Sequence, residues 1–349
     1  MLLKNEGVLP LKTSDPIALF GSGAEKTVKG GIGSGDVNNR ENISVYRGIK
    51  EVGVSVTNED WIQDYDKRYK EAREEWKEKI LEDARHVQNP FDAYAANPFA
   101  LPDGRRITEA DLKGAAAAVY MISRISGEGK DRRLEKGDYY LSSREREDIL
   151  YLDGLHIPLI LILNSGGPVE LTDILQETEN IRAVLNISQP GQEGGHAVAD
   201  ILFGRAVPEG KLTTTWAQQY EDYPFSDTYS YLNGNLEKEE YREGIYVGYR
   251  YFESFGVKPL FSFGYGLSYT SFKLEFHSLQ TEKSSVQARG TVTNAGRSYA
   301  GREVAQVYVS FPQGGIEKES RRLAGFEKTD PLMPGESREV TVEIRQKQL

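Results

Sequence analysis

The chain has 349 residues, which is enough for two domains with sizeable hydrophobic cores. Its 43 basic and 53 acidic side chains give a net charge of -10, and this negative field disfavours nucleic acid and anionic membranes as partners. The sequence contains no cysteine, so disulfides, a thiol nucleophile and a cysteine-based metal site are excluded.

Neither a metal nor a cofactor is expected. The four histidines are scattered without the spacing of metal ligands: His86, His156, His196 and His277. Residues 1–6 lack the charged-then-apolar order of a signal peptide, and no apolar run is as long as a membrane span. We therefore expect a soluble cytoplasmic protein.

Short apolar runs alternate with helical patterns through residues 1–212. Buried strands are expected at residues 16–20, 115–122, 158–163 and 181–187, with a further short strand at 53–57. Helices are expected at 44–52, from 142 onward, at 171–175 and at 194–203. This alternation predicts an α/β fold, a doubly wound and mostly parallel sheet covered on both faces.

A long charged segment interrupts this alternation. Residues 61–87 carry apolar side chains at helical spacing among many charges, which predicts a long exposed helix. The pairs Asn89-Pro90 and Asn97-Pro98 end the pattern, so residues 88–107 are expected to form an excursion from the sheet.

The remaining chain changes character twice. Residues 213–268 are aromatic-rich and lack periodicity, and we expect them to connect the two domains. Period-two patterns then predict an antiparallel β-sandwich over residues 269–349, with strands at 272–276, 286–292, 304–309, 323–327 and 340–344. Such a sandwich has about seven strands, so this module is expected to be incomplete.

Glu128 is the first candidate for chemistry. It lies between two glycines just after the predicted strand at 115–122, and open α/β sheets bind ligands at the carboxyl ends of their strands. Lys130, Asp131 and Arg132 add charge beside this carboxylate. For these residues alone, a solvated loop glutamate remains the simpler interpretation.

The motif Ser126-Gly127-Glu128-Gly129 resembles the acid/base loop of glycoside hydrolase family 3, the β-glucosidase-like retaining glycosidases. Other segments resemble the same family in the same order and cover nearly the whole chain: residues 3–11, the glycine-rich 30–35, 190–204 with 208–212, and 263–270. The resemblance implies an α/β sandwich domain over 1–212 that carries the acid/base loop, followed by the connector and a fibronectin type III-like module.

The resemblance also implies roles for particular residues. Glu128 would protonate the departing glycosidic oxygen and then activate the hydrolytic water. Asp36, Lys130 and Arg132 would contact the sugar of a β-linked oligosaccharide or glycoside. The family's nucleophile is an Asp on a (β/α)8 barrel that does not fit in this chain. A second chain or a missing segment is expected to supply the barrel, as in members with permuted domain order, and homo-oligomers are also possible.

Three competing interpretations stay open. Glu193 is a rival carboxylate in a glycine-rich stretch, although a place at a helix start explains it sufficiently. A non-catalytic carbohydrate-binding or scaffolding subunit would keep the same fold. Nucleotide binding is disfavoured because Gly21-Ser22-Gly23 lacks the third glycine of a dinucleotide fingerprint and residues 30–35 lack a P-loop ending.

Overall fold

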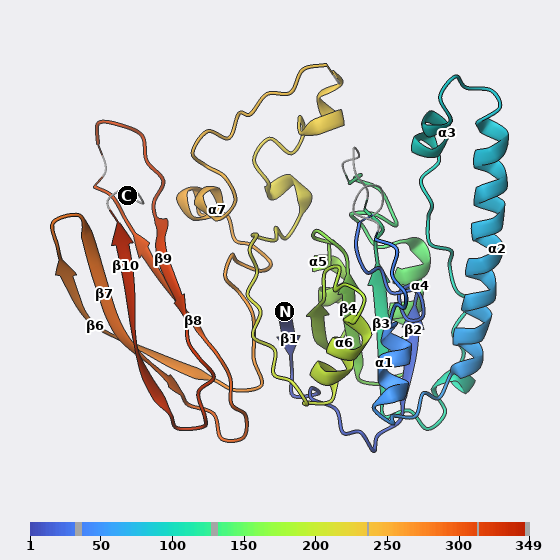
Figure 1. The fold of residues 1–349 in the computed structure, drawn as a ribbon, viewed down its shortest axis with the longest axis horizontal. Coiled ribbons are helices and arrows are strands. Elements are labelled where there is room, and N and C mark those ends of the chain that lie inside the picture. The colour runs from blue at the N-terminus through green and yellow to red at the C-terminus, as the bar shows by residue number, and fades with distance from the viewer. Residues whose placement is uncertain (32–36, 127–131, 236, 313, 346–349) are drawn as a thin grey trace. The chain divides into compact units, whose positions relative to one another are not determined.

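The computed structural model describes residues 1–31, 37–126, 132–235, 237–312 and 314–345 (Figure 1). The chain divides into two compact units, one of Lys4–Ala206 and one that joins Met1–Leu3 to Val207–Leu349. Within the described ranges, every helix is too short or too polar to cross a lipid bilayer.

A five-stranded sheet in the order β1-β5-β4-β3-β2 forms the centre of the first unit. β2 (Ile17–Gly21), β3 (Ala117–Ser123), β4 (Leu159–Asn164) and β5 (Ile181–Asn186) pair in parallel, and β1 (Leu2–Asn5) lies at one edge. Every residue of β2, β3 and β4 is buried, as a sheet covered on both faces requires. The predicted doubly wound α/β fold is therefore confirmed.

The predicted helices cover this sheet. α1 (Val45–Glu51) and α6 (Gly194–Leu202) pack together on one face, and α4 (Ser143–Gly154) packs on β3 (Figure 1). α5 (Thr172–Glu177) connects β4 to β5. Glycine permits the close approach of α6 to α1, because a methyl group at Gly195 would lie 2.0 Å from the Ser44 carbonyl oxygen.

One local prediction for this unit needs correction, and one strand was missed. The strand expected at 53–57 is only a single parallel bridge between Val56 and Ile17, because Gly53 turns the chain with a φ of 87° and α2 follows at once. β1 was not predicted, since four residues are too few for a periodic signal.

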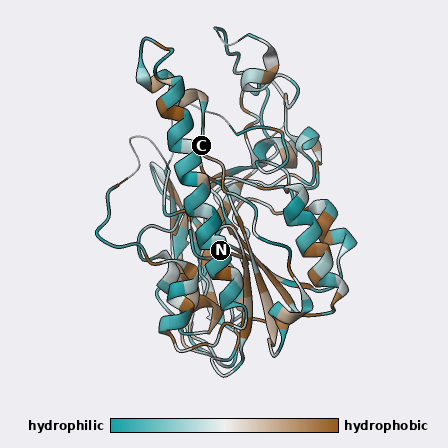
Figure 2. Cartoon of the chain, turned by 90° about the vertical axis from the view of Figure 1, so that its right-hand side faces the viewer, coloured by the Kyte–Doolittle hydropathy of each residue, from teal (hydrophilic) through white to brown (hydrophobic). Residues whose placement is uncertain are grey.

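The long exposed helix is confirmed as α2 (Glu59–Asp83), and the excursion after it contains the short helix α3 (Pro90–Ala96). Only the first two turns of α2 bury side chains, and the rest of the helix is predominantly hydrophilic (Figure 2). Trp76 packs edge to face with Tyr94 and Phe99, so aromatic contacts join α3 and the returning chain to α2.

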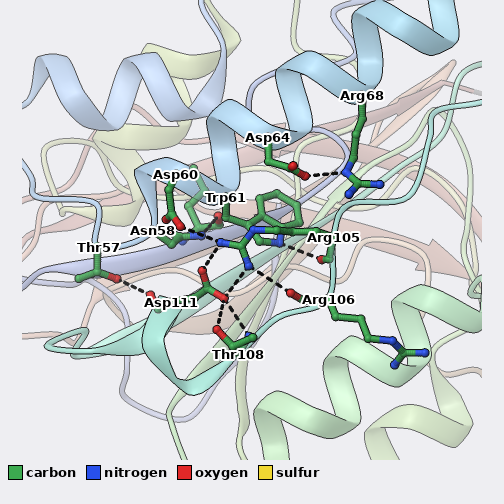
Figure 3. A network of polar contacts seen from close by, with 11 residues as sticks. Thr57, Asn58, Asp60, Trp61, Asp64, Arg68, Arg105, Arg106, Thr108 and Asp111 are labelled. Atoms are coloured by element: carbon green, nitrogen blue, oxygen red, sulfur yellow. Dashed lines mark hydrogen bonds and ion pairs between the residues drawn. The ribbon is translucent and has the colours of Figure 1, made fainter.

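A polar network fixes the end of this excursion to the start of α2 (Figure 3). The Arg105 guanidinium donates to both carboxylate oxygens of the buried Asp111, at 3.0 and 2.6 Å, and to Asp60 at 2.9 Å. Burial opposes ionisation of Asp111, but the hydrogen bonds from Arg105 and Thr108 hold its pKa below the usual value. The network thereby sets the path of the chain into β3.

A second buried pair joins β3 to α4. The Tyr120 hydroxyl on β3 donates to the Asp148 carboxylate on α4 over 3.1 Å, and both side chains are buried. Burial raises the pKa of Asp148 to about 6, against the opposing effects of the Tyr120 hydrogen bond and the Arg144 charge. The folded state therefore holds this proton more tightly than the unfolded chain does.

Replacement of Asp148 by asparagine is expected to flatten the pH dependence of stability. The stabilisation by the protonated carboxyl is complete below about pH 4, the unfolded value, and is lost as the pH rises through about 6. Between about pH 5 and pH 8 the wild-type chain should lose about 1 kcal/mol more stability than Asp148→Asn, in which the amide oxygen still accepts from Tyr120.

Urea unfolding at both pH values measures this difference. His196 also has a raised pKa, through hydrogen bonds to Glu51 and Glu193, and stabilisation by its charge is likewise lost as the pH rises. It titrates in both proteins, so comparison of their slopes isolates Asp148. Equal slopes would contradict the prediction.

The second unit contains the predicted antiparallel strands. One sheet has the order β10-β7-β6, with β6 (Phe272–Thr281), β7 (Ser285–Asn294) and β10 (Ser337–Arg345), and the other pairs β8 (Val304–Val309) with β9 (Arg322–Lys328). Val292, Ala305, Leu332 and Val340 form the shared core, with Phe272 packed against them. The antiparallel β-sandwich is confirmed.

The aromatic-rich segment of this unit is more ordered than its sequence predicts. It contains α7 (Tyr249–Phe255), which begins after Gly248 and ends at Gly256, both with positive φ. Helix α7 was not predicted because its seven residues are largely aromatic and carry little helical periodicity. The Tyr249 hydroxyl accepts from the backbone amide of Leu323 at 2.7 Å, which ties α7 to β9.

Candidate active site at the carboxyl edge of the sheet

The two sequence segments singled out for chemistry begin at the same edge of the sheet. Glu128 and Lys130 lie outside the described residues, as does Asp36, whereas Arg132 is described. The residues on either side of the two segments, from the ends of β2 and β3 onward, define the geometry of this edge.

Asn164, the last residue of β4, organises this edge. Its side chain is fully buried, its Oδ1 accepts from the Val28 amide at 2.7 Å, and its Nδ2 donates to the carbonyls of Val28 at 2.9 Å and Ser188 at 2.7 Å. One amide group thus holds the chain after β2 and the chain after β5 against the end of β4.

The chains that lead into the two undescribed segments also lie together. A methyl group at Gly31 would lie 3.7 Å from the Ser126 carbonyl oxygen. Gln189, after β5, donates to the Ser126 hydroxyl at 2.9 Å, and the Gly191 amide donates to the Lys29 carbonyl at 2.8 Å. The segments that contain Asp36 and Glu128 consequently start side by side.

Arg124, directly after β3, is fixed from all sides. Its Nη1 and Nη2 reach the two carboxylate oxygens of Glu145 on α4 at 2.7 and 2.8 Å, and this ion pair is buried. Its remaining donors meet the carbonyl oxygens of Ser123, Asp138 and Tyr140 at 2.9, 2.7 and 3.2 Å. All five N–H groups of the guanidinium are therefore used within the chain.

Glu145 also caps the first turn of α4. Its Oε2 accepts from the Ser142 amide at 2.8 Å, and the Ser142 hydroxyl accepts from the Glu145 amide at 3.0 Å. This reciprocal capping box fixes the first turn of α4. The start of α4 is thus bound to the end of β3 through one carboxylate.

Arg132 secures the other end of the same segment. Its Nε donates to the Asp138 carboxylate at 2.5 Å, and its Nη1 reaches the Pro168 carbonyl at 2.6 Å and the Ser165 hydroxyl at 3.2 Å, after β4. Its Nη2 donates to the Asp138 carbonyl at 2.6 Å. These bonds leave one N–H of the guanidinium without a partner among the described residues.

Arg124 and Arg132 thus share an acceptor, the carbonyl oxygen of Asp138. Residues 125–131 lie between these two arginines, so both ends of the segment are anchored to one point of the chain.

The rival carboxylate Glu193 has a different environment. It precedes α6, its side chain is 65% exposed, and its Oε2 lies 2.7 Å from Nδ1 of His196. His196 Nε2 meets Glu51 on α1 at 2.5 Å, so the three side chains link two helices at the surface. This arrangement supports a structural role for Glu193.

The sequence did not single out Arg124 or Asp138. The available signals were an arginine at the carboxyl end of a buried strand and a Ser-x-x-Glu capping box at 142–145, but neither identifies the other as its partner. Asn164 was recognisable only as a polar residue that ends a strand.

Comparisons with known proteins agree with this architecture. The domain family described as "Glycosyl hydrolase family 3 C-terminal domain" matches residues 1–269, and "Fibronectin type III-like domain" matches residues 303–349. Beta-glucosidase A of Butyrivibrio fibrisolvens is 34% identical over 385 residues, covering 99% of this chain and 44% of that protein.

Solved structures give the same picture. Beta-glucosidase 3B from Thermotoga neapolitana, in complex with alpha-D-glucose, matches with 38% identity and a TM-score of 0.84 over 99% of this chain and 47% of its own. A beta-glucosidase from Paenibacillus barengoltzii matches with 33% identity and a TM-score of 0.85 over 99% of this chain and 37% of its own. The chain therefore spans less than half the length of these three relatives.

Proposed function

Because the chain belongs to glycosyl hydrolase family 3, we propose that it is the acid/base-bearing part of a retaining β-glycosidase that hydrolyses terminal β-linked sugars. One observation supports this most directly. Arg124 and Arg132 anchor both ends of the segment that contains Glu128, at the edge where doubly wound sheets bind their ligands.

The proposed reaction uses Glu128 twice. As the acid it donates its proton to the glycosidic oxygen while that bond to the sugar breaks, and as the carboxylate it then takes a proton from the water that attacks the glycosyl-enzyme. The second carboxyl group of a retaining pair, roughly 5–5.5 Å away, is proposed to be an Asp nucleophile on a (β/α)8 barrel.

Three further residues are proposed to contact the sugar. Asp36 belongs to a segment that starts beside Ser126, and Lys130 belongs to the segment of Glu128. Arg132 would use the one N–H that its contacts leave available. In this proposal residues 1–212 carry the site, 213–268 connect, and 269–349 form part of a fibronectin type III-like module.

The 349-residue chain alone is expected not to hydrolyse nitrophenyl β-glucoside above the uncatalysed rate, because the nucleophile is proposed to lie on the barrel. Intact-mass analysis of the purified sample establishes whether a second polypeptide is present, and release of nitrophenol is measured in parallel. Activity should appear when a barrel-bearing polypeptide is added. Near-normal turnover by a single 39.1 kDa species would contradict the proposal.

A second outcome would favour the scaffolding alternative. If the chain binds β-linked sugars but no activity appears on addition of the barrel, its role is binding rather than hydrolysis. A chain carrying Glu128→Gln is the matched control, because it should assemble with the barrel in the same way but remain inactive.

A further inference from the structure

An aromatic hollow lies in the second unit, within the segment before the β-sandwich. Its volume is about 180 Å³, and its lining residues come from the chain around 224 and from 242–255: Pro224, Phe225, Arg242, Glu243, Tyr246, Tyr251 and Phe255. All of them belong to one compact unit. The hollow is therefore a feature of that unit by itself.

Three of the rings that line this hollow pack against one another at an angle. Phe255, on α7, lies 4.9 Å from Tyr246 and 5.0 Å from Tyr251 between ring centroids, at interplanar angles of 66° and 40°. Phe255 is nevertheless 57% exposed, so one side of its ring faces outward. Exposed aromatic surface held in a concave site is typical of ligand binding.

Phe225, which also lines the hollow, has a strained backbone. Phe225 has a φ of 55°, in the left-handed region that a bulky side chain rarely adopts, and the residue is 36% exposed. The Arg242 guanidinium lies 4.6 Å from the centroid of this ring. A strained backbone that presents an aromatic ring to the outside suggests a function for that ring.

Unused hydrogen-bonding groups surround these rings. Among the described residues, the side chains of Arg242 and Glu243 and the hydroxyl of Tyr251 form no hydrogen bond or ion pair with the rest of the chain. In contrast, the Tyr246 hydroxyl is held by Glu317 at 3.0 Å. The hollow therefore combines apolar ring faces with a guanidinium, a carboxylate and a hydroxyl that make no hydrogen bonds to other described residues.

We propose that this hollow binds a neutral pyranose of a β-linked glucan or glucoside. The C–H face of a pyranose ring packs on the electron-rich face of an aromatic ring, and its hydroxyls both donate and accept. Arg242 donates, Glu243 accepts, and Tyr251 does both. Arg242 and Glu243 carry opposite charges, and the Glu317 carboxylate lies against the Tyr246 hydroxyl, so the surroundings of the hollow disfavour a phosphate or a carboxylate and suit a neutral sugar better.

The choice of a β-linked sugar rests on the proposed function, but sugar binding in the hollow does not depend on the acid/base role proposed for Glu128, because the hollow lies in the other compact unit. Sugar binding here requires neither a nucleophile nor a barrel. It would add a second carbohydrate contact to the chain, one that holds a polymer or an extended glycoside without acting on its bonds.

Calorimetric titration of the 349-residue chain with cellotetraose tests the proposal. Binding is expected with a dissociation constant of about 0.1–1 mM, which is usual for a small exposed site. Phe255→Ala should weaken it at least about tenfold, because the stacking face is lost. The matched control is Phe276→Ala on β6, another exposed phenylalanine, at 69%, and it should leave the affinity unchanged.

Three results would overturn the inference. The first is no binding at about 10 mM cellotetraose. The second is equal binding by the wild-type and Phe255→Ala chains, and the third is binding that is lost in Glu128→Gln but kept in Phe255→Ala.

A second variant is used if Phe255→Ala melts earlier than the wild-type chain. Arg242→Gln then replaces it, since that exposed side chain has no structural partner to lose besides the Phe225 ring. This variant should weaken binding severalfold, and unchanged affinity would also overturn the inference.

Discussion

Replacement of Glu128 by glutamine is expected to lower kcat/KM for cellobiose by about 10²–10⁴-fold in the chain completed with its barrel. Glutamine keeps the shape of the side chain but has no proton to donate to the departing oxygen and no base to activate water. Cellobiose has a poor leaving group, so its glycosidic bond depends strongly on this proton. Steady-state kinetics on cellobiose measure the effect.

The leaving group separates acid catalysis from a general loss of structure. A dinitrophenyl β-glucoside has a leaving group that departs without protonation, so Glu128→Ala should form the glycosyl-enzyme readily and be slow only in its hydrolysis. Azide should then restore turnover and yield the β-glucosyl azide. Failure of rescue together with equal losses on both substrates would contradict the acid/base assignment.

Glu193→Gln is the matched control for this experiment. Glu193 also lies in a glycine-rich stretch, but its carboxylate contacts His196 at the surface beside α6. Its replacement should leave kcat/KM within about twofold of the wild-type value, because surface substitutions away from the site rarely change activity. A collapse in Glu193→Gln and normal activity in Glu128→Gln would reverse the two roles.

The buried strands were predictable because their residues are apolar over their full length. The run at 115–122 became β3 and the run at 158–163 became β4, each shifted by one or two residues. The order of strands in the sheet could not be derived in the same way. β1 contains four residues and pairs beside β5, and this pairing depends on contacts far apart in the sequence.

The candidate site was predictable only in part, for a related reason. A carboxylate between glycines at the end of a strand leaves a sequence motif, so Glu128 could be named as a candidate. The anchor that Arg124 and Arg132 share is a backbone carbonyl, that of Asp138, and carbonyl groups carry no residue-type signal. Arg132 was predicted to contact the sugar, whereas most of its donors bind Asp138, Ser165 and Pro168.

The two arginines also differ in how much of the fold depends on them. The Arg132 side chain is 23% exposed and joins loops to one another, whereas that of Arg124 is 6% exposed and joins a strand to a helix. A buried ion pair is costly to break, because the charge left behind has no water to solvate it. Arg124 is therefore the anchor whose loss should affect stability most.

Arg124→Met is expected to destabilise the first unit by about 3–5 kcal/mol, because it leaves the Glu145 carboxylate buried without its partner and the Ser123, Asp138 and Tyr140 carbonyls without a donor. Urea unfolding followed by tryptophan fluorescence reports mainly on this unit, since Trp61 and Trp76 lie in it and the third tryptophan, Trp216, lies in the other unit. Arg124→Lys should recover little, because one ammonium group cannot reproduce the bidentate contact.

The double variant Arg124→Met with Glu145→Gln shows whether the stability lost in Arg124→Met comes from an unpaired buried charge or from lost packing. Glutamine still accepts from the Ser142 amide and so keeps the capping box, but it is neutral and leaves no buried charge without a partner. The double variant should be more stable than Arg124→Met alone, and the coupling between the two positions should exceed about 1 kcal/mol. Additive losses would mean that the guanidinium acts on this edge through its carbonyl contacts alone. If Arg124→Met is destabilised but the double variant is not, the stability of the β3 end depends on the buried charge pair.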